Sequence, residues 1–228
     1  MDRNLLAPVG NSSCGLSRRD LIRMGAAVSL LIACGDRPGV TAEPDVRFDF
    51  TKPLANWETV AGQWTIEDVP GAVNEKALVQ RAIDNSFNVI VAPGGPYTNV
   101  EVSVRFKPIS GREDASGGIV FRFAEGRYYL IRANALEDNF NLYYFDRDTW
   151  FAFLTGGRFE ITGASTKAPA LGEWHALRIA AQGDHIEGWL NGRPLIDHRD
   201  SRFTAGRVGL WTKADSVTAF DSLVVRPL

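Results

Sequence analysis

The sequence predicts an all-β fold, a jelly-roll β-sandwich built from two antiparallel sheets. Residues 174–221 contain several short apolar runs that alternate with period two and show no helical spacing, which is typical of a sandwich core. Between two of these runs lies Asn191-Gly192, a strong hairpin signal, because both central residues of a type I′ turn need positive φ. The chain of 228 residues, 45% hydrophobic with 22 Gly and 13 Phe, suits one such domain behind a leader.

Residues 1–33 have the pattern of an export signal. Ser17-Arg18-Arg19 resembles a twin-arginine motif, and the apolar run at 24–33 is too short to span a bilayer. The translocase that reads paired arginines moves folded proteins across the membrane. We therefore expect the mature protein outside the cytoplasm, in the periplasm or on the cell surface.

A cysteine follows the apolar run. Residues 31–34 read Leu-Ile-Ala-Cys and resemble a lipobox, so we expect cleavage before Cys34 and a lipid anchor on this residue. The alternative is cleavage by ordinary signal peptidase at Val-Thr-Ala, residues 40–42. Residues 34–45 then form a polar tether, and residues 46–228, which contain no cysteine, form the sandwich domain.

The first half of the domain reads as short strands and turns. Strands are expected at 46–50, near 57, and at 63–67, 78–79 and 87–91, and Pro-Gly-Gly-Pro at 93–96 breaks the chain. Residues 100–107 alternate strictly between apolar and polar side chains. We expect the three valines and Phe106 of this strand to be buried and the polar side chains to face solvent.

The second half continues in the same way. A surface loop is expected at 111–115, followed by a strand in which Ile119, Phe121 and Phe123 face the core and Arg122 faces away. Further strands are expected at 128–134, 140–145 and 150–154, with turns at 137–139 and 146–148. Residues 159–161 start a stretch rich in Gly, Ser, Thr and Pro, which predicts a loop that runs to residue 172.

Several motifs of the domain resemble one known family. Residues 174–179 read Trp-x-x-Leu-x-Ile, residues 189–192 read Trp-Leu-Asn-Gly, and residues 206–216 read Gly-x-Val-Gly-Leu-Trp-Thr-Lys-Ala-Asp-Ser; residues 116–122 and 128–134 fit the same pattern. Over residues 46–228 the chain resembles concanavalin A-like lectin/glucanase domains, and among them the bacterial keto-disaccharide hydrolase domains, distant relatives of glycoside hydrolase family sixteen. The resemblance implies a ligand on the concave sheet of the sandwich.

The alternation of side chains along each strand predicts which residues share that face. Those opposite the apolar rows are Arg122, Tyr128, Arg132, Asn134, Asn141, Tyr143, Glu187, Trp189, Trp211 and Lys213. Amides and charged groups bind sugar hydroxyls and aromatic rings cover sugar C–H surfaces, so the set has the composition of a carbohydrate site. The alternative is an ordinary solvated sheet face with cross-strand ion pairs.

The number and spacing of the carboxylates fit both an enzyme and a binding domain. Most glycosidases need two, and the Glu-x-Asp-x-x-Glu strand of family-sixteen hydrolases has no counterpart in this sequence. A 3-keto sugar can lose its aglycone by elimination and hydration, for which Glu187, Asp215 and His198 are the candidate bases. Keto-disaccharide hydrolase domains often carry Tyr-Glu-x-Gln-Ile-x-Asp, whereas residues 128–134 read Tyr-Tyr-Leu-Ile-Arg-Ala-Asn and lack both carboxylates.

Metal and nucleic-acid sites have weaker support. No spacing of His, Asp or Glu matches a zinc site, and Asp146-x-Asp148 or residues 137–139 are the candidate calcium ligands, with plain turn chemistry as the alternative. A net charge of −2 gives no electrostatic reason to expect nucleic acid. We expect an exported domain that binds or processes a glycan or small sugar; the second hypothesis is a non-catalytic surface lipoprotein that mediates adhesion or protein assembly.

Overall fold

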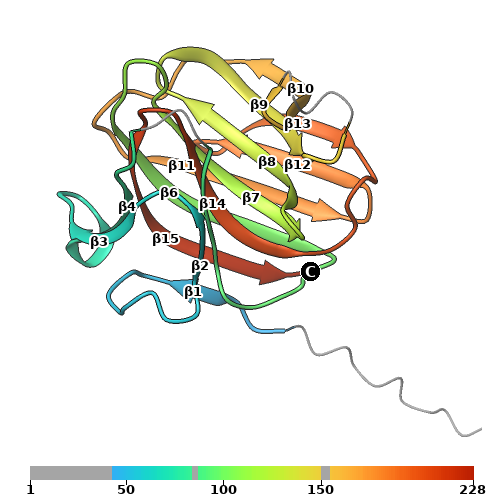
Figure 1. Cartoon of the computed structure of the whole chain (residues 1–228), viewed down its shortest axis with the longest axis horizontal. Helices are drawn as coiled ribbons and strands as arrows, with labels where there is room; N and C mark the ends of the chain where they lie inside the picture. Colours follow the sequence, from blue (N-terminus) through green and yellow to red (C-terminus); the bar gives the residue numbers. More distant parts are fainter. Residues whose placement is uncertain (1–42, 84–86, 150–154) are drawn as a thin grey trace, which may run out of the picture. The chain divides into compact units, whose positions relative to one another are not determined.

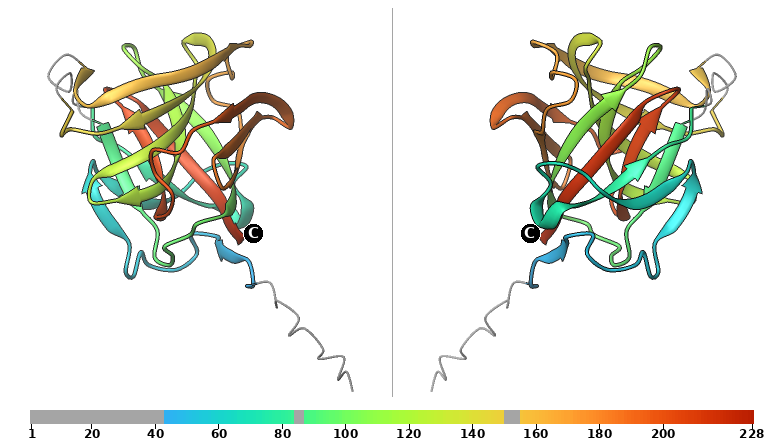
Figure 2. Two further views of the ribbon diagram at one scale, coloured as in Figure 1. Left: turned by 90° about the vertical axis from the view of Figure 1, so that its right-hand side faces the viewer. Right: turned by 90° about the vertical axis from the view of Figure 1, so that its left-hand side faces the viewer.

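A computed structural model describes residues 43–83, 87–149 and 155–228 of the protein. Their strands form two antiparallel sheets, one of eight strands and one of seven (Figures 1 and 2). The predicted all-β sandwich is confirmed, and the helical element in this part of the chain is a short 3-10 turn at Val73–Glu75. No helix among the described residues is both long and apolar enough to cross a bilayer.

The eight-stranded sheet has the order β13-β12-β11-β6-β15-β4-β3, and β1 also pairs with β15. The strands are β1 Val46–Phe48, β3 Trp64–Asp68, β4 Lys76–Gln80, β6 Val100–Ser110, β11 His175–Gln182, β12 His185–Leu190, β13 Arg193–Arg199 and β15 Val217–Pro227. Because β15 pairs with β1, β4 and β6, the beginning and the end of the domain are joined in one sheet (Figure 1).

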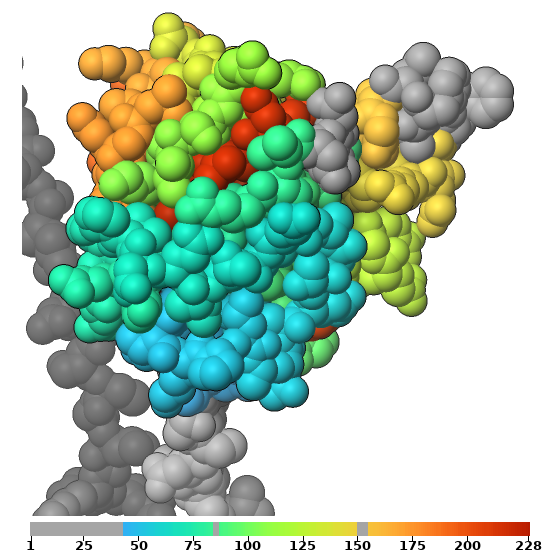
Figure 3. Space-filling view, turned by 60° about the vertical axis from the view of Figure 1, so that its left-hand side comes forward, coloured from blue at the N-terminus to red at the C-terminus, as the bar shows by residue number. Residues whose placement is uncertain are grey.

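The seven-stranded sheet has the order β10-β9-β8-β7-β14-β5-β2. Its strands are β2 Glu58–Ala61, β5 Phe87–Val91, β7 Ser116–Ala124, β8 Arg127–Asn134, β9 Glu137–Phe145, β10 Arg158–Ser165 and β14 Arg207–Lys213. Four consecutive strands, β7 to β10, form an antiparallel meander, and β14 joins this meander to β5 and β2 from the first half of the domain. In the space-filling view, the early segments in blue and teal lie directly against green and red segments from later in the chain (Figure 3).

The core lies between the two sheets. One cluster of buried side chains draws on both of them, with Val102, Phe106 and Ile179 from one sheet and Ile131 and Leu210 from the other. The alternation expected at residues 100–107 is confirmed, because buried and partly exposed residues alternate along β6. The hairpin at Asn191-Gly192 is also confirmed, since both residues have positive φ, 51° and 79°.

One expectation for β7 is wrong. Ile119 and Phe121 face the core, but Phe123 packs in a separate cluster on the opposite face of the sheet. The reason is a β-bulge: the register between β7 and β8 shifts between Phe121 and Ala124, and Arg122 has a φ of 52°. An extra residue in one strand reverses the alternation beyond it.

Three connecting segments also differ from expectation. The predicted loop after residue 158 begins with the edge strand β10, whose backbone pairs with β9 despite its Gly and Ser residues. Residues 137–139, expected as a turn, open β9. The expected surface loop at 111–115 contains two buried residues, Asp114 and Ala115. The strand expected at 150–154 lies outside the described residues.

Candidate functional site

The seven-stranded sheet buries apolar side chains on both of its faces. A second cluster, separate from the core, contains Val89, Val91, Val120, Phe123, Tyr128, Leu130, Tyr143, Phe145 and Trp211, with Phe87 packed against it. These residues belong to strands of this sheet alone, and on β8 and β9 they alternate with core residues. They therefore lie on the face turned away from the eight-stranded sheet, which we call the outer face.

Aromatic rings form a continuous row on the outer face. Phe87 stacks on Trp211 with 5.6 Å between ring centroids and meets Phe145 edge-on at 5.8 Å. Tyr128 stacks on Phe145 at 4.8 Å and on Phe123 at 5.9 Å. Burial raises the pKa of Tyr128, so its hydroxyl stays protonated at neutral pH. A hollow of about 290 Å³ is lined by Phe87, Phe123, Tyr128, Phe145 and Arg147, among others.

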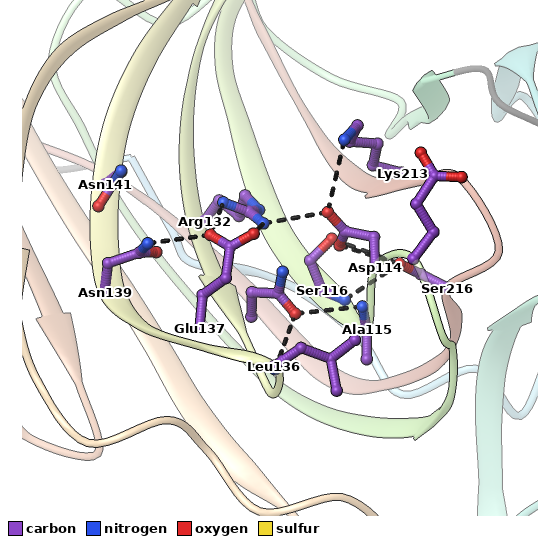
Figure 4. A network of polar contacts seen from close by, with 12 residues as sticks. Asp114, Ala115, Ser116, Arg132, Leu136, Glu137, Asn139, Asn141, Lys213 and Ser216 are labelled. Carbon is purple, nitrogen blue, oxygen red and sulfur yellow. Dashed lines mark hydrogen bonds and ion pairs between the residues drawn. The ribbon is translucent and has the colours of Figure 1, made fainter.

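A buried arginine is the centre of the polar part of this face (Figure 4). Arg132 of β8 has Nη2 at 3.0 Å from both Asp114 Oδ2 and Glu137 Oε1, and Nη1 at 3.1 Å from Glu137 Oε2. The side chains of Arg132 and Asp114 are only 3% and 1% exposed, whereas that of Glu137 is 42% exposed. Glu137 is thus the member of this triad that solvent reaches.

The charges of the triad stabilise one another. Hydrogen bonds from Arg132 lower the pKa of Glu137 to about 2, so this carboxylate is ionised at neutral pH. Burial alone would lower the pKa of Arg132. The negative charge of Asp114 and the hydrogen bonds to Glu137 have a larger effect than burial, so the pKa of Arg132 is raised. Arg132 and Glu137 are therefore both charged at neutral pH.

Asp114 is held in place by the turn that follows β14. Asp215 accepts hydrogen bonds from the backbone N–H groups of Arg112, Glu113 and Asp114 at 2.7, 3.0 and 3.0 Å, and the first of these contributes most to lowering the pKa of Asp215. Asp114 Oδ1 accepts a hydrogen bond from Ser216 Oγ at 3.2 Å. The loop at 111–115 therefore has a fixed place beside the sheet.

A tyrosine hydroxyl connects the triad to β9 and β10. Tyr143 Oη accepts hydrogen bonds from Arg132 Nη1 at 3.3 Å and from Asn141 Nδ2 at 2.9 Å. Because both neighbours donate, the hydroxyl hydrogen of Tyr143 is free to point elsewhere. Asn141 Nδ2 also donates to Glu160 Oε2 at 2.9 Å. A Cβ at position 163 would lie 2.5 Å from Asn141 Oδ1, so Gly163 is needed for this close approach.

The outer face also contains polar atoms that are shielded from solvent and lack a hydrogen-bond partner. Among them are Arg132 Nε, Asn134 Nδ2, Asn139 Oδ1, Asn141 Oδ1 and Arg158 Nη1. Buried polar groups in proteins are usually paired, and exceptions gather where a ligand or water completes the bonding. Their concentration around one triad marks this face as the candidate binding site.

The structure brings most of the predicted site residues to this face. Strands β8, β9 and β14 contribute Tyr128, Arg132, Asn134, Asn141, Tyr143, Trp211 and Lys213. Lys213 Nζ lies 3.9 Å from Asp114 Oδ2 (Figure 4). Asn134 Oδ1 accepts hydrogen bonds from the backbone N–H groups of Ala115 and Leu136, so its position is that of a turn cap. These contacts join the strands to the loop at 111–115.

Other predicted residues lie elsewhere. Glu187 and Trp189 belong to β12 and His198 to β13, all in the eight-stranded sheet. Arg122 is 1% exposed and donates to the backbone carbonyls of Phe203, Thr98 and Gly183, so it joins loops instead of facing a ligand. Alternation within one strand cannot show which of two sheets that strand joins, so it groups Glu187 and Trp189 with residues of the other sheet. Arg122 does belong to the seven-stranded sheet, but it lies at the bulge of β7.

Sequence reasoning missed four charged residues of the site: Asp114, Glu137, Arg158 and Glu160. In the sequence, Asp114 lies in an expected surface loop, Glu137 in an expected turn and Glu160 at the start of an expected loop. Arg158 precedes that loop and is assigned to no expected element. No local pattern pairs Asp114 with Arg132, because a β-hairpin and the carboxylate of Asp215 bring them together. A buried arginine in a strand does call for carboxylates, and Arg132 was the available signal.

No group of three or more His, Cys, Asp or Glu side chains in the described parts of the chain could hold a metal ion. The candidate calcium ligands have other partners. Both oxygens of Glu137 accept from Arg132, and Asp146 Oδ1 accepts from the backbone N–H of Asp148 at 2.9 Å, as in an ordinary Asx turn.

Comparison with known proteins gives consistent matches. Levanase of Bacillus subtilis (strain 168) is 28% identical over 165 residues, which is 71% of this chain but only 21% of levanase. The carbohydrate binding module CBM66 from Bacillus subtilis aligns with a TM-score of 0.62 at 22% identity, over 75% of this chain and 94% of the module. A Bacillus subtilis protein of unknown function with a galectin-like fold aligns with a TM-score of 0.62 at 12% identity, over 82% and 97%. Both structural matches show the sandwich fold.

The chain spans about a fifth of the length of levanase, so its likeness concerns one domain of that protein. The family model described as the 3-keto-alpha-glucoside-1,2-lyase-like domain matches residues 46–226, nearly the whole of the described sandwich. The resemblance to keto-disaccharide hydrolase domains is thereby confirmed, and the chain belongs to the 3-keto-alpha-glucoside-1,2-lyase-like domain family.

Proposed function

We propose that the domain binds carbohydrate on the outer face of its seven-stranded sheet. The observation that carries this proposal is the Arg132 triad, in which a buried arginine holds one buried and one exposed carboxylate beside shielded polar atoms without partners. Its donors and acceptors suit sugar hydroxyls, and the hollow lined by Phe87, Tyr128 and Phe145 suits the C–H surface of a sugar ring. The family and the likeness to a carbohydrate binding module support the same ligand class.

The same geometry supports binding more than hydrolysis by two carboxylates. That mechanism needs one carboxylic acid with a raised pKa, which donates its proton to the leaving group. Glu137 has a pKa of about 2 and is a poor proton donor at neutral pH. Asp114 is 1% exposed and bound to Arg132, so a substrate cannot reach it without displacing that arginine.

A glycan array followed by a turnover assay on 3-keto-glucosides tests this proposal. We expect the purified domain to bind a defined group of glycans, and Tyr143→Phe to weaken that binding about tenfold, because the variant loses a hydroxyl that orients both Arg132 and Asn141. Turnover would add an enzymatic activity to the binding. The absence of any glycan binding would remove the carbohydrate proposal and leave a surface protein for adhesion or assembly.

We propose further that the domain acts outside the cytoplasm on a lipid anchor. The paired arginines Arg18 and Arg19 and the cysteine at position 34 support this, and all three lie outside the described residues. Fractionation of cells that express the wild type and Cys34→Ala tests it. We expect the wild type with the membranes and the variant released in soluble form, whereas a variant that stays on the membrane would contradict the anchor.

A further inference from the structure

Two arginines of the outer face differ in how their charge is balanced. Arg132 contacts two carboxylates, those of Asp114 and Glu137, each at 3.0 Å. The guanidinium of Arg158, at the start of β10, makes no ion pair with any described residue, and its Nη1 is shielded from solvent without a hydrogen-bond partner. Among the residues that the structure describes, no carboxylate therefore pairs directly with the charge of Arg158.

Aromatic rings surround Arg158 instead of carboxylates. Its Cζ lies 4.6 Å from the ring centroid of Tyr143, 5.3 Å from that of Phe87 and 5.6 Å from that of Trp211. Cation–π contacts replace only part of the hydration that a guanidinium loses on burial. The same burial lowers the pKa of Arg158, although an arginine remains charged at neutral pH. The residue as a whole is partly exposed, so a ligand can approach it.

Three carboxylates that the structure describes on the outer face have other partners. Asp114 and Glu137 are bound to Arg132, and Glu160 accepts a hydrogen bond from Asn141. Two more cations lie on the same face: Lys213, 3.9 Å from Asp114, and Arg147, whose Cζ lies 5.4 Å from the ring centroid of Phe145. An acidic group that enters from solvent can accept hydrogen bonds from the N–H groups of the Arg158 guanidinium. Because this guanidinium is poorly hydrated, such charge-assisted hydrogen bonds are strong.

We propose that Arg158 binds an oxyanion group carried by a sugar, a carboxylate or a sulfate ester, so that the outer face prefers acidic glycans to their neutral counterparts. This inference rests on the proposed carbohydrate function and adds a ligand class to it. The aromatic rings around the guanidinium limit its hydration, and the sugar ring that carries the acid lies in the hollow lined by Phe87, a ring that Arg158 also contacts.

Matched oligosaccharides that differ in charge alone test the inference. The probes are an oligogalacturonate, its fully methyl-esterified form, a sulfated oligosaccharide and its desulfated form, each titrated calorimetrically into the wild-type domain. We expect the acidic member of at least one pair to bind about tenfold or more tightly than its neutral partner, and that preference to weaken with added salt. The two pairs distinguish a carboxylate from a sulfate ester as the bound group.

The variant Arg158→Gln removes the charge and keeps most of the side-chain length. We expect it to bind acidic and neutral members equally, with its affinity for the neutral member within about twofold of the wild type. Arg127→Gln is the matched control, because Arg127 begins β8 of the same sheet and pairs with the exposed Glu125. This variant should keep the full preference for the acidic member. If Arg158→Gln unfolds, Arg158→Lys, which keeps the charge but lacks the fork, should retain only part of the preference.

The outcomes separate this inference from the function on which it rests. Equal binding of acidic and neutral members by the wild type, or a preference that survives in Arg158→Gln, overturns the role of Arg158 and leaves carbohydrate binding intact. If the wild type binds neutral glycans of the array but none of the four probes, the role of Arg158 is also overturned. If it binds no glycan at all, both the inference and the carbohydrate function are overturned.

Discussion

Asp114 and Arg132 form an ion pair with 3.0 Å between Oδ2 and Nη2, and neither side chain is more than 3% exposed. Asp114 belongs to a loop and Arg132 to the middle of a β-sheet, so the pair joins a connecting segment to the framework. Such buried pairs add little to stability as a whole, but the loss of one partner leaves an uncompensated charge. The pair is therefore suited to fix the position of a site on the outer face.

The first prediction concerns this pair. Asp114→Ala should lower the free energy of unfolding by about 3 kcal/mol, the lower end of the range for broken buried pairs, because Arg132 keeps Glu137 as a partner. Urea denaturation measures the change. Glu125→Ala, which removes the exposed partner of Arg127, is the control and should change stability by less than about 1 kcal/mol. Equal effects of the two substitutions would show that the buried pair is not a fixed element.

The second prediction concerns acid stability. The pKa of Glu137 is depressed in the folded state, to about 2 from an ordinary 4.5. A depressed pKa stabilises the fold when the carboxylate is ionised, so the contribution is complete above about pH 4.5 and is lost as the pH falls toward 2. The melting temperature of Glu137→Gln should therefore lie below that of the wild type at pH 6, and the two should converge near pH 2. A constant difference across this range would mean that Glu137 is not paired with Arg132 in solution.

The third prediction concerns the loop at 111–115. Asp215→Ala removes the acceptor of three backbone hydrogen bonds, so amide exchange in this loop should rise and glycan affinity should fall about tenfold. Asp49→Ala is the control, because Asp49 accepts one backbone hydrogen bond, from Thr51, in a turn near the start of the domain. Normal protection of residues 111–115 in Asp215→Ala would contradict the anchoring role.

The fourth prediction separates the two sheets. Trp189 and Glu187 belong to the eight-stranded sheet, and Trp189 is covered by Arg178, whose Cζ lies 3.6 Å from the ring centroid. Trp189→Ala and Glu187→Gln should therefore leave glycan affinity unchanged within about twofold, whereas Tyr143→Phe weakens it. A tenfold loss in Trp189→Ala would move the binding site to the other sheet.

The sequence was sufficient for the sandwich and for part of the site. Strict alternation at residues 100–107 and the Asn191-Gly192 hairpin follow from local chemistry, and both are present in the structure. Arg132 and Asn141 were placed together because they are polar residues in apolar strands, and they are cross-strand neighbours.

The sequence could not predict the features that depend on contacts between distant segments of the chain. The bulge at Arg122 reverses the side of Phe123, and nothing local announces it. Assignment of a strand to one sheet or the other depends on pairing between distant segments, which is why Trp189 and Trp211 were grouped together although they lie in different sheets. Asp114 is in a polar loop, and only the fold brings it to Arg132.

The most direct test of the central claim is amide hydrogen exchange with and without a glycan identified on the array. The account predicts that the glycan protects the loop at 111–115 and strands β8, β9 and β10, where the Arg132 triad and its neighbours lie. Protection confined to β6, β11 and β12 of the other sheet would contradict it.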